Sequence, residues 1–137
     1  MMKGVRSAPH YAVTSGGRDG PPSFDEVLYA WVQEALEPLG PVTMRKMMGA
    51  ATLYLDGVIF AVLDESELWF KSDAGANAIW DAEGCERFSF TLKDGTVETM
   101  NYRRAPADVY DDAEAMQRWA ALAREAGTRA ASTRRKR

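Results

Sequence analysis

The dipeptide Asp56-Gly57 separates two short apolar segments, residues 51–55 and 58–63. Aspartate and glycine both tolerate the positive φ angles of a type I′ turn, the commonest two-residue connection within a β-hairpin. Because a two-residue turn can join only antiparallel strands, the dipeptide predicts two adjacent antiparallel strands. This single feature favours a sheet built from hairpins over a parallel sheet with helical crossovers.

Turn residues predict further strands on both sides of this hairpin. Residues 42–48 can form a strand before it, and residues 67–71 follow a turn at Asp64-Glu65. The segment 67–71 is either a fourth strand or a continuation of the third. The sequence KDGT lies between residues 88–92 and 97–102 and indicates a second hairpin.

A first helix is predicted before the strands. Ser23 and Glu26 have the spacing of a capping box. In this motif the side chain of each residue accepts a hydrogen bond from the backbone N–H of the other. Apolar residues then follow at alternating spacings of three and one, which places them on one helical face: Phe24, Val27, Leu28, Trp31, Val32, Ala35, Leu36 and Leu39. Pro38 and the pair Gly40-Pro41 end this helix.

Two more helices follow. A short one begins near Asp73, has Ile79 and Trp80 on its apolar side and ends at Gly84. The last begins at Asp111 or Asp112 and is predicted to end at Gly127. The order of elements is therefore one helix, three or four strands, one helix, two strands and one helix. It predicts an α+β fold, a two-layer sandwich with helices on one face of an antiparallel sheet.

The 137 residues suffice for one domain. Residues 1–22 are rich in Gly, Pro and Ser and are predicted to be a disordered leader, residues 23–127 form the domain, and residues 128–137 form a disordered basic tail. The last nine residues hold five basic side chains and no acidic one. Without those five, the net charge of −3 becomes −8. An acidic domain with a basic tail is not built to lie along nucleic acid, although the tail can contact it.

The chemistry of enzymes is largely missing from the sequence. The only histidine, His10, lies in the predicted leader, and the only cysteine, Cys85, follows a predicted helix C-terminus, where the helix dipole disfavours a thiolate. We therefore predict a protein that is not an enzyme and has no catalytic residue, no cofactor and no metal site. One cysteine, no signal peptide and no apolar segment of membrane-spanning length predict a cytoplasmic protein.

The predicted strands carry apolar residues on both faces. Phe60 and Val62 lie on one side of the third strand by simple alternation, and Ile59 and Leu63 lie on the other. Three helices would cover mainly one face, so we expect the second face to bind a protein partner or another copy in a homodimer. The alternative is that a bent terminal helix, or the side chains of Lys46 and Lys71, cover it within the chain.

Two sets of candidate interaction residues follow from these patterns. The first set lies on the predicted strands and comprises Arg45, Lys46, Met47, Gly49, Tyr54, Trp69, Tyr102, Arg103 and Arg104. The alternative function is nucleic-acid binding. It would use the arginines and the lysine of this set with the tail residues Arg134, Arg135, Lys136 and Arg137.

The segment MRKMMGAATLYLDGVIFAVL resembles the TfoX N-terminal domain family of the bacterial TfoX/Sxy competence regulators. The later segments ELWFKSD and AEGCERFSFTLKDGTVETMNYRRAP and the closing DDAEAMQRWAALAREA extend the resemblance from about residue 23 to residue 126. The family usually has Met-Phe-Gly-Gly at residues 47–50 and a glycine at Thr52. Losing those glycines implies less need here for unusual φ angles or close backbone approach.

The resemblance implies a fold like that of YgaC and the type III secretion chaperones. It also implies a non-enzymatic role in transcription regulation or protein interaction. The full-length competence regulators resemble this chain only in their first half, and their second, helical domain has no counterpart after Gly127.

Overall fold

The computed structural model describes residues 25–47 and 50–136 and has an α+β fold. One antiparallel sheet contains six strands in the order β1-β2-β3-β4-β6-β5. The strands are β1 (Val42–Met47), β2 (Ala50–Leu55), β3 (Val58–Asp64), β4 (Glu67–Lys71), β5 (Arg87–Thr91) and β6 (Val97–Arg104). The helices are α2 (Glu26–Ala35), α3 (Asn77–Ala82) and α4 (Ala113–Lys136), with two short 3₁₀ helices, η2 (Glu37–Leu39) and η3 (Ala107–Tyr110).

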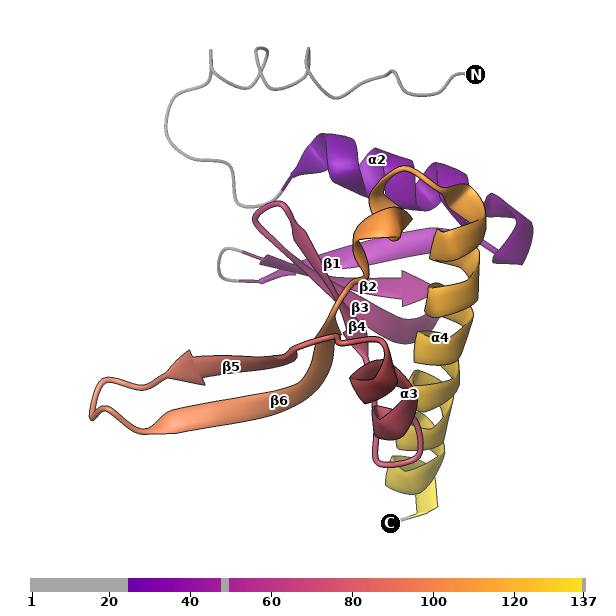
Figure 1. Ribbon diagram of the computed structural model, residues 1–137. Coiled ribbons are helices and arrows are strands. Elements are labelled where there is room, and N and C mark those ends of the chain that lie inside the picture. Colours follow the sequence, from indigo (N-terminus) through magenta and orange to yellow (C-terminus); the bar gives the residue numbers. More distant parts are fainter. Residues whose placement is uncertain (1–24, 48–49, 137) are drawn as a thin grey trace, which may run out of the picture.

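The helices lie on one side of β1–β4, which confirms the predicted two-layer arrangement (Figure 1). The β5–β6 hairpin instead extends away from the helices, to the left in Figure 1. None of the described helices is long and apolar enough to span a membrane. The predicted leader, residues 1–22, lies outside the described residues.

The first hairpin is confirmed in detail. Asp56 and Gly57 have φ angles of 53° and 83°, and Leu55 pairs with Val58. Both turn residues are therefore in the left-handed region that a type I′ turn requires. The second hairpin is also present, with Gly95 at a φ of 91°.

The start of the first helix differs from the prediction. Helix α2 begins at Glu26, and its N-cap is Asp25, whose Oδ1 accepts hydrogen bonds from the N–H groups of Val27 and Leu28 at 3.1 and 3.0 Å. Asp25 also accepts from Ser66 Oγ, in the turn between β3 and β4, at 3.0 Å. This tertiary contact favours Asp25 over the predicted cap at Ser23, which lies outside the described residues.

The end of the last helix was predicted wrongly. Helix α4 continues through Gly127 to Lys136, so the segment predicted as a disordered tail is helical as far as Lys136. A Cβ atom on Gly127 would lie 2.0 Å from Ile59 O and 3.0 Å from Val58 Cγ1. The glycine therefore lets the helix backbone lie directly against β3, and it does not end the helix.

Aromatic rings link the two layers of the core. The ring of Trp80, which is fully buried, lies 5.6 Å from that of Phe70 and 4.9 Å from that of Trp119. These three residues come from α3, β4 and α4. The stack therefore fixes the short helix α3 between the sheet and the terminal helix.

A β-bulge changes the side on which Phe60 lies. Tyr54 pairs with Ile59 and Leu53 pairs with Ala61, so Phe60 is an extra residue on β3. Phe60 is fully buried in the core, and its ring lies 6.3 Å from Phe70. Simple alternation predicted that Phe60 and Val62 share a face of the sheet. Because of the bulge, they lie on opposite faces.

Candidate functional site

The face of the sheet that points away from α2 and α4 is called the outer face here. Directly opposed residues of neighbouring strands share a face, so the register Thr52–Val62–Trp69–Arg104 traces one row across β2, β3, β4 and β6. Arg45 of β1 pairs with Thr52 and extends the row to five strands. Val62 and Trp69 of this row line the candidate site.

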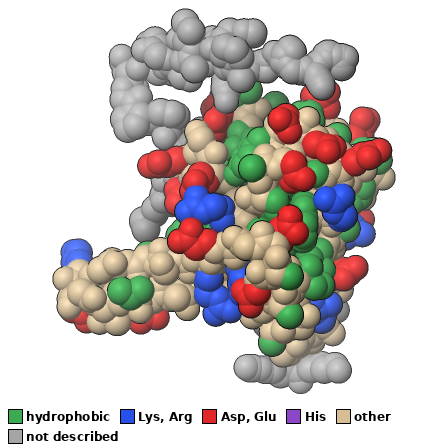
Figure 2. Space-filling model, in the orientation of Figure 1, with side chains coloured by type: hydrophobic (Ala, Val, Ile, Leu, Met, Phe, Trp, Pro, Cys, Tyr) green, Lys and Arg blue, Asp and Glu red, His purple; other side chains and the backbone are tan. Residues whose placement is uncertain are grey.

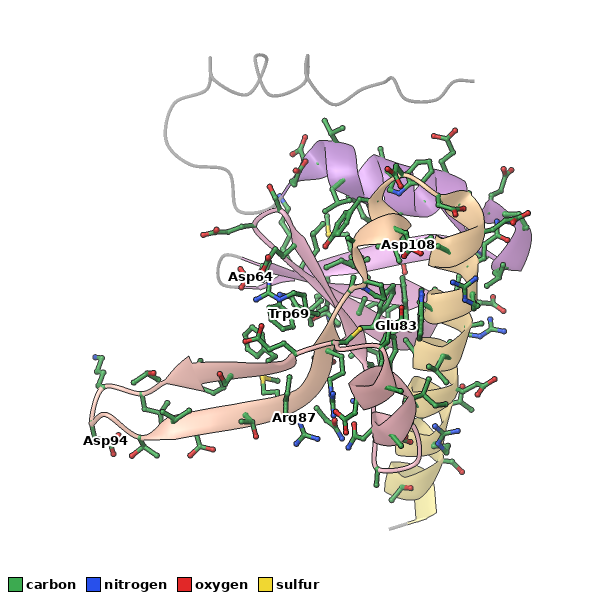
Figure 3. The ribbon with its side chains drawn as sticks, viewed as in Figure 1. Asp64, Trp69, Glu83, Arg87, Asp94 and Asp108 are labelled. Atoms are coloured by element: carbon green, nitrogen blue, oxygen red, sulfur yellow. The ribbon has the colours of Figure 1, made fainter. Side chains whose placement is uncertain are left out.

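A pocket of about 200 Å³ opens on the outer face where the β5–β6 hairpin leaves the sheet. Its walls are mainly aromatic and aliphatic and include one carboxylate: Ala50, Val62, Asp64, Trp69, Phe88, Met100 and Tyr102. Figure 3 shows Asp64 and Trp69 close together beside the base of the hairpin. Within the described part of the chain, the Asp64 carboxylate has no ion-pair partner, and the buried Trp69 Nε1 has no hydrogen-bond acceptor.

Trp69 is held between an aromatic ring and a cation. The ring of Phe88 meets it edge-on at 4.9 Å, and the Arg104 guanidinium lies over it at 4.7 Å. Arg104 also forms ion pairs with Glu67 and, at 3.4 Å, with Glu86. Arg104 is therefore part of the pocket's framework, and its charge is already balanced by two carboxylates.

Tyr102 forms the next part of the same face. The Lys71 ammonium lies 5.0 Å from the centre of its ring. Burial, with a smaller contribution from Tyr54, raises the pKa of Tyr102 above its usual range, so the phenol stays neutral. The contact confirms that Lys71 covers part of the outer face. Lys46 pairs with Ala51, so it lies on the helix-facing side of the sheet and does not cover the outer face.

Arg103 is not at the candidate site. It pairs with Phe70, so its side chain lies on the helix-facing side, where it is 4% exposed. Its Nη1 donates to Asp81 Oδ1 at 2.7 Å and to Cys85 O at 2.9 Å, which ties β6 to α3. We therefore correct the prediction: Arg103 stabilises the fold and cannot contact a partner.

The remaining predicted strand residues that the structure describes lie on β1 and β2, toward the edge of the sheet opposite β5. Arg45 and Lys46 are exposed on β1, which is an edge strand, and Met47 is its last residue. Tyr54 is half-buried on β2 between Thr43 and Ile59. Gly49 lies outside the described residues. Arg45 and Arg104 are four strand spacings apart, about 19 Å, so the predicted basic residues do not form one cluster.

The β5–β6 hairpin has the largest group of exposed apolar side chains. All residues from 89 to 100 are exposed, and four of them are large and apolar: Phe90 (40%), Leu92 (40%), Val97 (63%) and Met100 (43%). The Phe90 ring lies 6.2 Å from Phe88, which connects the hairpin to the pocket. In Figure 2 the hairpin is a thin arm with few charges, whereas acidic side chains gather around α2.

A second, more open pocket of about 340 Å³ lies beside the end of α4. Arg129 bonds Asp73 there through Nε at 2.6 Å and through Nη2 at 3.0 Å. This ion pair fastens the helix after Gly127 to the loop between β4 and α3. Beyond it, Arg134, Arg135 and Lys136 continue the helical backbone, and Arg137 lies outside the described residues.

The Asp73–Arg129 pair makes part of the stability depend on pH. Arg129 holds the pKa of the Asp73 carboxyl below its usual range. A carboxyl whose pKa is lowered by folding stabilises the folded state above its unfolded pKa of about 4, and this contribution is lost as the pH falls through the lowered value. Asp73→Asn is therefore expected to be less stable than the native chain in urea at pH 7. The difference should shrink below pH 4. Thr128→Ala, at an exposed residue of α4 that does not titrate, is the control and its difference from the native chain should not change with pH.

Two further observations concern the metal-ligating side chains and the single cysteine thiol. Within residues 25–47 and 50–136, no three His, Cys, Asp or Glu side chains are placed to hold a metal ion. Burial raises the pKa of the Cys85 thiol, and the carboxylates of Glu83 and Asp108 add smaller contributions. The charge of Arg103 acts in the opposite direction, but the pKa stays raised. The thiol is therefore a buried core group and a poor nucleophile.

Several residues of the pocket were not predicted from the sequence. Asp64 is the last residue of β3, and Phe88 and Met100 lie on β5 and β6. Phe88 and Phe90 alternate with Ser89 and Thr91, which predicts that both rings share a face. The alternation does not indicate that the β5–β6 hairpin extends beyond the part of the sheet that the helices cover (Figure 1).

A comparison with protein families relates this geometry to known sequences. The family model described as the TfoX N-terminal domain matches residues 34–127. The match includes every strand of the sheet and the pocket on its outer face. No curated protein matches the chain.

Proposed function

The chain belongs to the TfoX N-terminal domain family, and from this premise we propose that it is a non-enzymatic interaction domain that binds a protein partner in a regulatory role. The observation that supports the proposal most is the β5–β6 hairpin. It places four large apolar side chains in solvent next to an aromatic pocket. Exposed apolar groups of this kind are typical of surfaces that bind other proteins.

The polar groups of the pocket suit a protein ligand. The Asp64 carboxylate can accept a hydrogen bond from a partner's backbone or side chain, and Trp69 Nε1 can donate one if a small movement exposes it. Protein interfaces combine an apolar centre with a few such bonds, and aromatic residues are enriched in them. The pocket and the hairpin together provide both features on one face.

Nucleic-acid binding is the alternative and has less support. Its predicted strand residues are dispersed: Arg103 is buried, Arg104 is paired with two carboxylates, and Arg45 lies across the sheet. Arg134, Arg135 and Lys136 are the remaining basic residues of this alternative, and the helical backbone of α4 runs through them. Residues 86–100 of the hairpin carry three acidic and two basic side chains, which does not favour contact with phosphates.

The more specific role follows from the family name. We propose that the partner belongs to the machinery of bacterial transcription, that the domain acts in the cytoplasm, and that regulation of competence is the first pathway to test. Fold alone does not determine this role, so the partner must be identified by experiment.

The test is capture of partners from a native lysate by the intact chain and by Phe90→Lys. The new ammonium can pair with Glu98 directly across the ladder, so the hairpin is expected to keep its fold while losing an apolar contact. Capture of the specific partner should fall at least about tenfold, which corresponds to a loss of about 1.4 kcal/mol.

Ile79→Lys is the matched control, because Ile79 is 48% exposed but lies on α3, outside the outer face. Its capture should equal that of the native chain. Equal capture by Phe90→Lys would show that the hairpin is not the binding surface. A partner lost only after nuclease treatment would instead support the nucleic-acid alternative.

A further inference from the structure

Strand β5 is an open edge of the sheet. Among the strands of residues 25–47 and 50–136 it is the last in the order, and it pairs only with β6. The pairing of β5 with β6 shifts register between Arg87 and Ser89. On one side of the shift Leu92 N donates to Thr96 O at 2.8 Å, and on the other Glu86 O accepts from Arg104 N at 2.8 Å, so even-numbered residues of β5 direct their backbone groups toward β6 on both sides. Because these directions alternate along a strand, Arg87, Ser89 and Thr91 direct their N–H and C=O groups outward.

Side chains cover the opposite edge of the sheet, at β1, whereas no side chain of the described residues is found to bond the outward backbone groups of β5. The outward carbonyl of Val42 on β1 accepts hydrogen bonds from Gln33 Nε2 at 3.2 Å and from the Tyr29 hydroxyl at 3.4 Å. Arg45 and Lys46 add exposed charges to that strand. Charges and covering side chains are the usual means of preventing edge-to-edge pairing. Strand β5 has a single charge, on Arg87, and otherwise presents Phe, Ser and Thr.

We propose that a second copy of this chain pairs antiparallel with β5, so that two sheets join into one across a twofold axis at Ser89. The proposal rests on the proposed function, because it uses the same exposed hairpin and adds a second copy of the chain as a protein that binds there. In this register Ser89 lies opposite Ser89 of the partner subunit, and Arg87 lies opposite the partner's Thr91. Phe88 lies opposite the partner's Phe90.

The direction of the backbone groups supports this register. The outward residues Arg87, Ser89 and Thr91 become the hydrogen-bonded pairs, and all five residues of β5 find a partner. An axis one residue further along, at Phe90, would pair only three strand residues and would oppose Arg87 to the partner's Lys93. Directly opposed like charges are destabilising, so the axis at Ser89 is preferred.

The side chains supply the apolar contact for the joined edge. Phe88 and Phe90 would form two non-hydrogen-bonded pairs with the partner's rings, the pairs in which side chains approach most closely. The four rings would be continuous with Trp69, because Phe88 already contacts it at 4.9 Å. The hairpin has a net charge of −1 over residues 86–100, so two copies can approach at this edge with little repulsion.

Sedimentation of the intact chain over a wide concentration range tests the proposal. The native chain and Ser89→Asn should form dimers. Ser89→Asp, which differs from the asparagine variant only in charge, places two carboxylates opposite each other and should raise the dimer dissociation constant at least about tenfold. Ser89→Pro removes an outward N–H that β6 does not use and should have the same effect.

Cross-linking tests the register. In a Cys85→Ala background, Ser89→Cys should be joined to its copy by a short bismaleimide, because directly opposed Cα atoms of a hydrogen-bonded pair lie about 5.5 Å apart. Thr91→Cys is the control. Its two copies would be separated by four residues along the strand, about 13 Å, beyond the reach of such a linker.

Each outcome separates this inference from the proposed function. A native chain that stays monomeric at all concentrations, or a dimer that both Ser89→Asp and Ser89→Pro leave intact, would overturn pairing at β5. Efficient cross-linking at Thr91 with none at Ser89 would overturn the register. Capture of another protein that depends on Phe90, by a chain that sediments as a monomer at all concentrations, would keep the proposed function and reject the dimer.

Discussion

Gly127→Ala is expected to lower the free energy of unfolding by about 3 kcal/mol, although alanine normally favours a helix over glycine by about 1 kcal/mol. The added Cβ would lie 2.0 Å from Ile59 O, a distance that forces the backbone of α4 or β3 to move. Overpacking of this kind is costly because the nearest atom belongs to a strand and not to a flexible side chain.

Urea unfolding followed by far-UV circular dichroism measures the effect. Thr128→Ala is the control, since Thr128 is exposed on the neighbouring position of the same helix. It should be neutral or slightly stabilising, because alanine has the higher helix propensity. If Gly127→Ala were as stable as Thr128→Ala, the helix would not lie against β3 as closely as the structure shows.

Trp80→Ala is expected to destabilise the fold by about 3–5 kcal/mol, the range typical of large aromatic side chains removed from a core. Trp80 is fully buried, and its ring contacts those of Phe70 and Trp119. The substitution would leave a cavity between three elements and would release α3 from the sheet and from α4.

Ile79→Ala is the control for this variant. The two residues are neighbours on α3, but Ile79 is 48% exposed, so its truncation should cost less than about 1 kcal/mol. Chemical unfolding of both variants provides the comparison. Equal losses at the two positions would contradict the assignment of Trp80, and not Ile79, to the centre of the core.

The sequence predicted the strands because their turns are encoded locally. Asp56-Gly57 tolerates the positive φ angles of a type I′ turn, and these are found. The end of α4 could not be predicted in this way, because Gly127 has two physical meanings. A glycine after an apolar helical segment usually ends the helix, but it also permits close backbone approach. Only the position of Ile59 O distinguishes these meanings.

The candidate site was predicted only in part for a similar reason. Trp69 and Tyr102 lie at the pocket as aromatic strand residues, whereas Arg103, one position from Tyr102, lies on the opposite face and is buried. Choosing the face of Arg103 requires the register with Phe70, which the sequence does not provide. The bulge at Phe60 likewise breaks an alternation that sequence patterns assume to be regular.

The β5–β6 hairpin also has a consequence for how this family can change over time. Its exposed residues lie outside the core formed by Phe70, Trp80 and Trp119, so substitutions there should cost little folding free energy. On the function proposed above, recognition and stability can therefore change almost separately in this domain. Relatives with the same fold would then be able to acquire different partners.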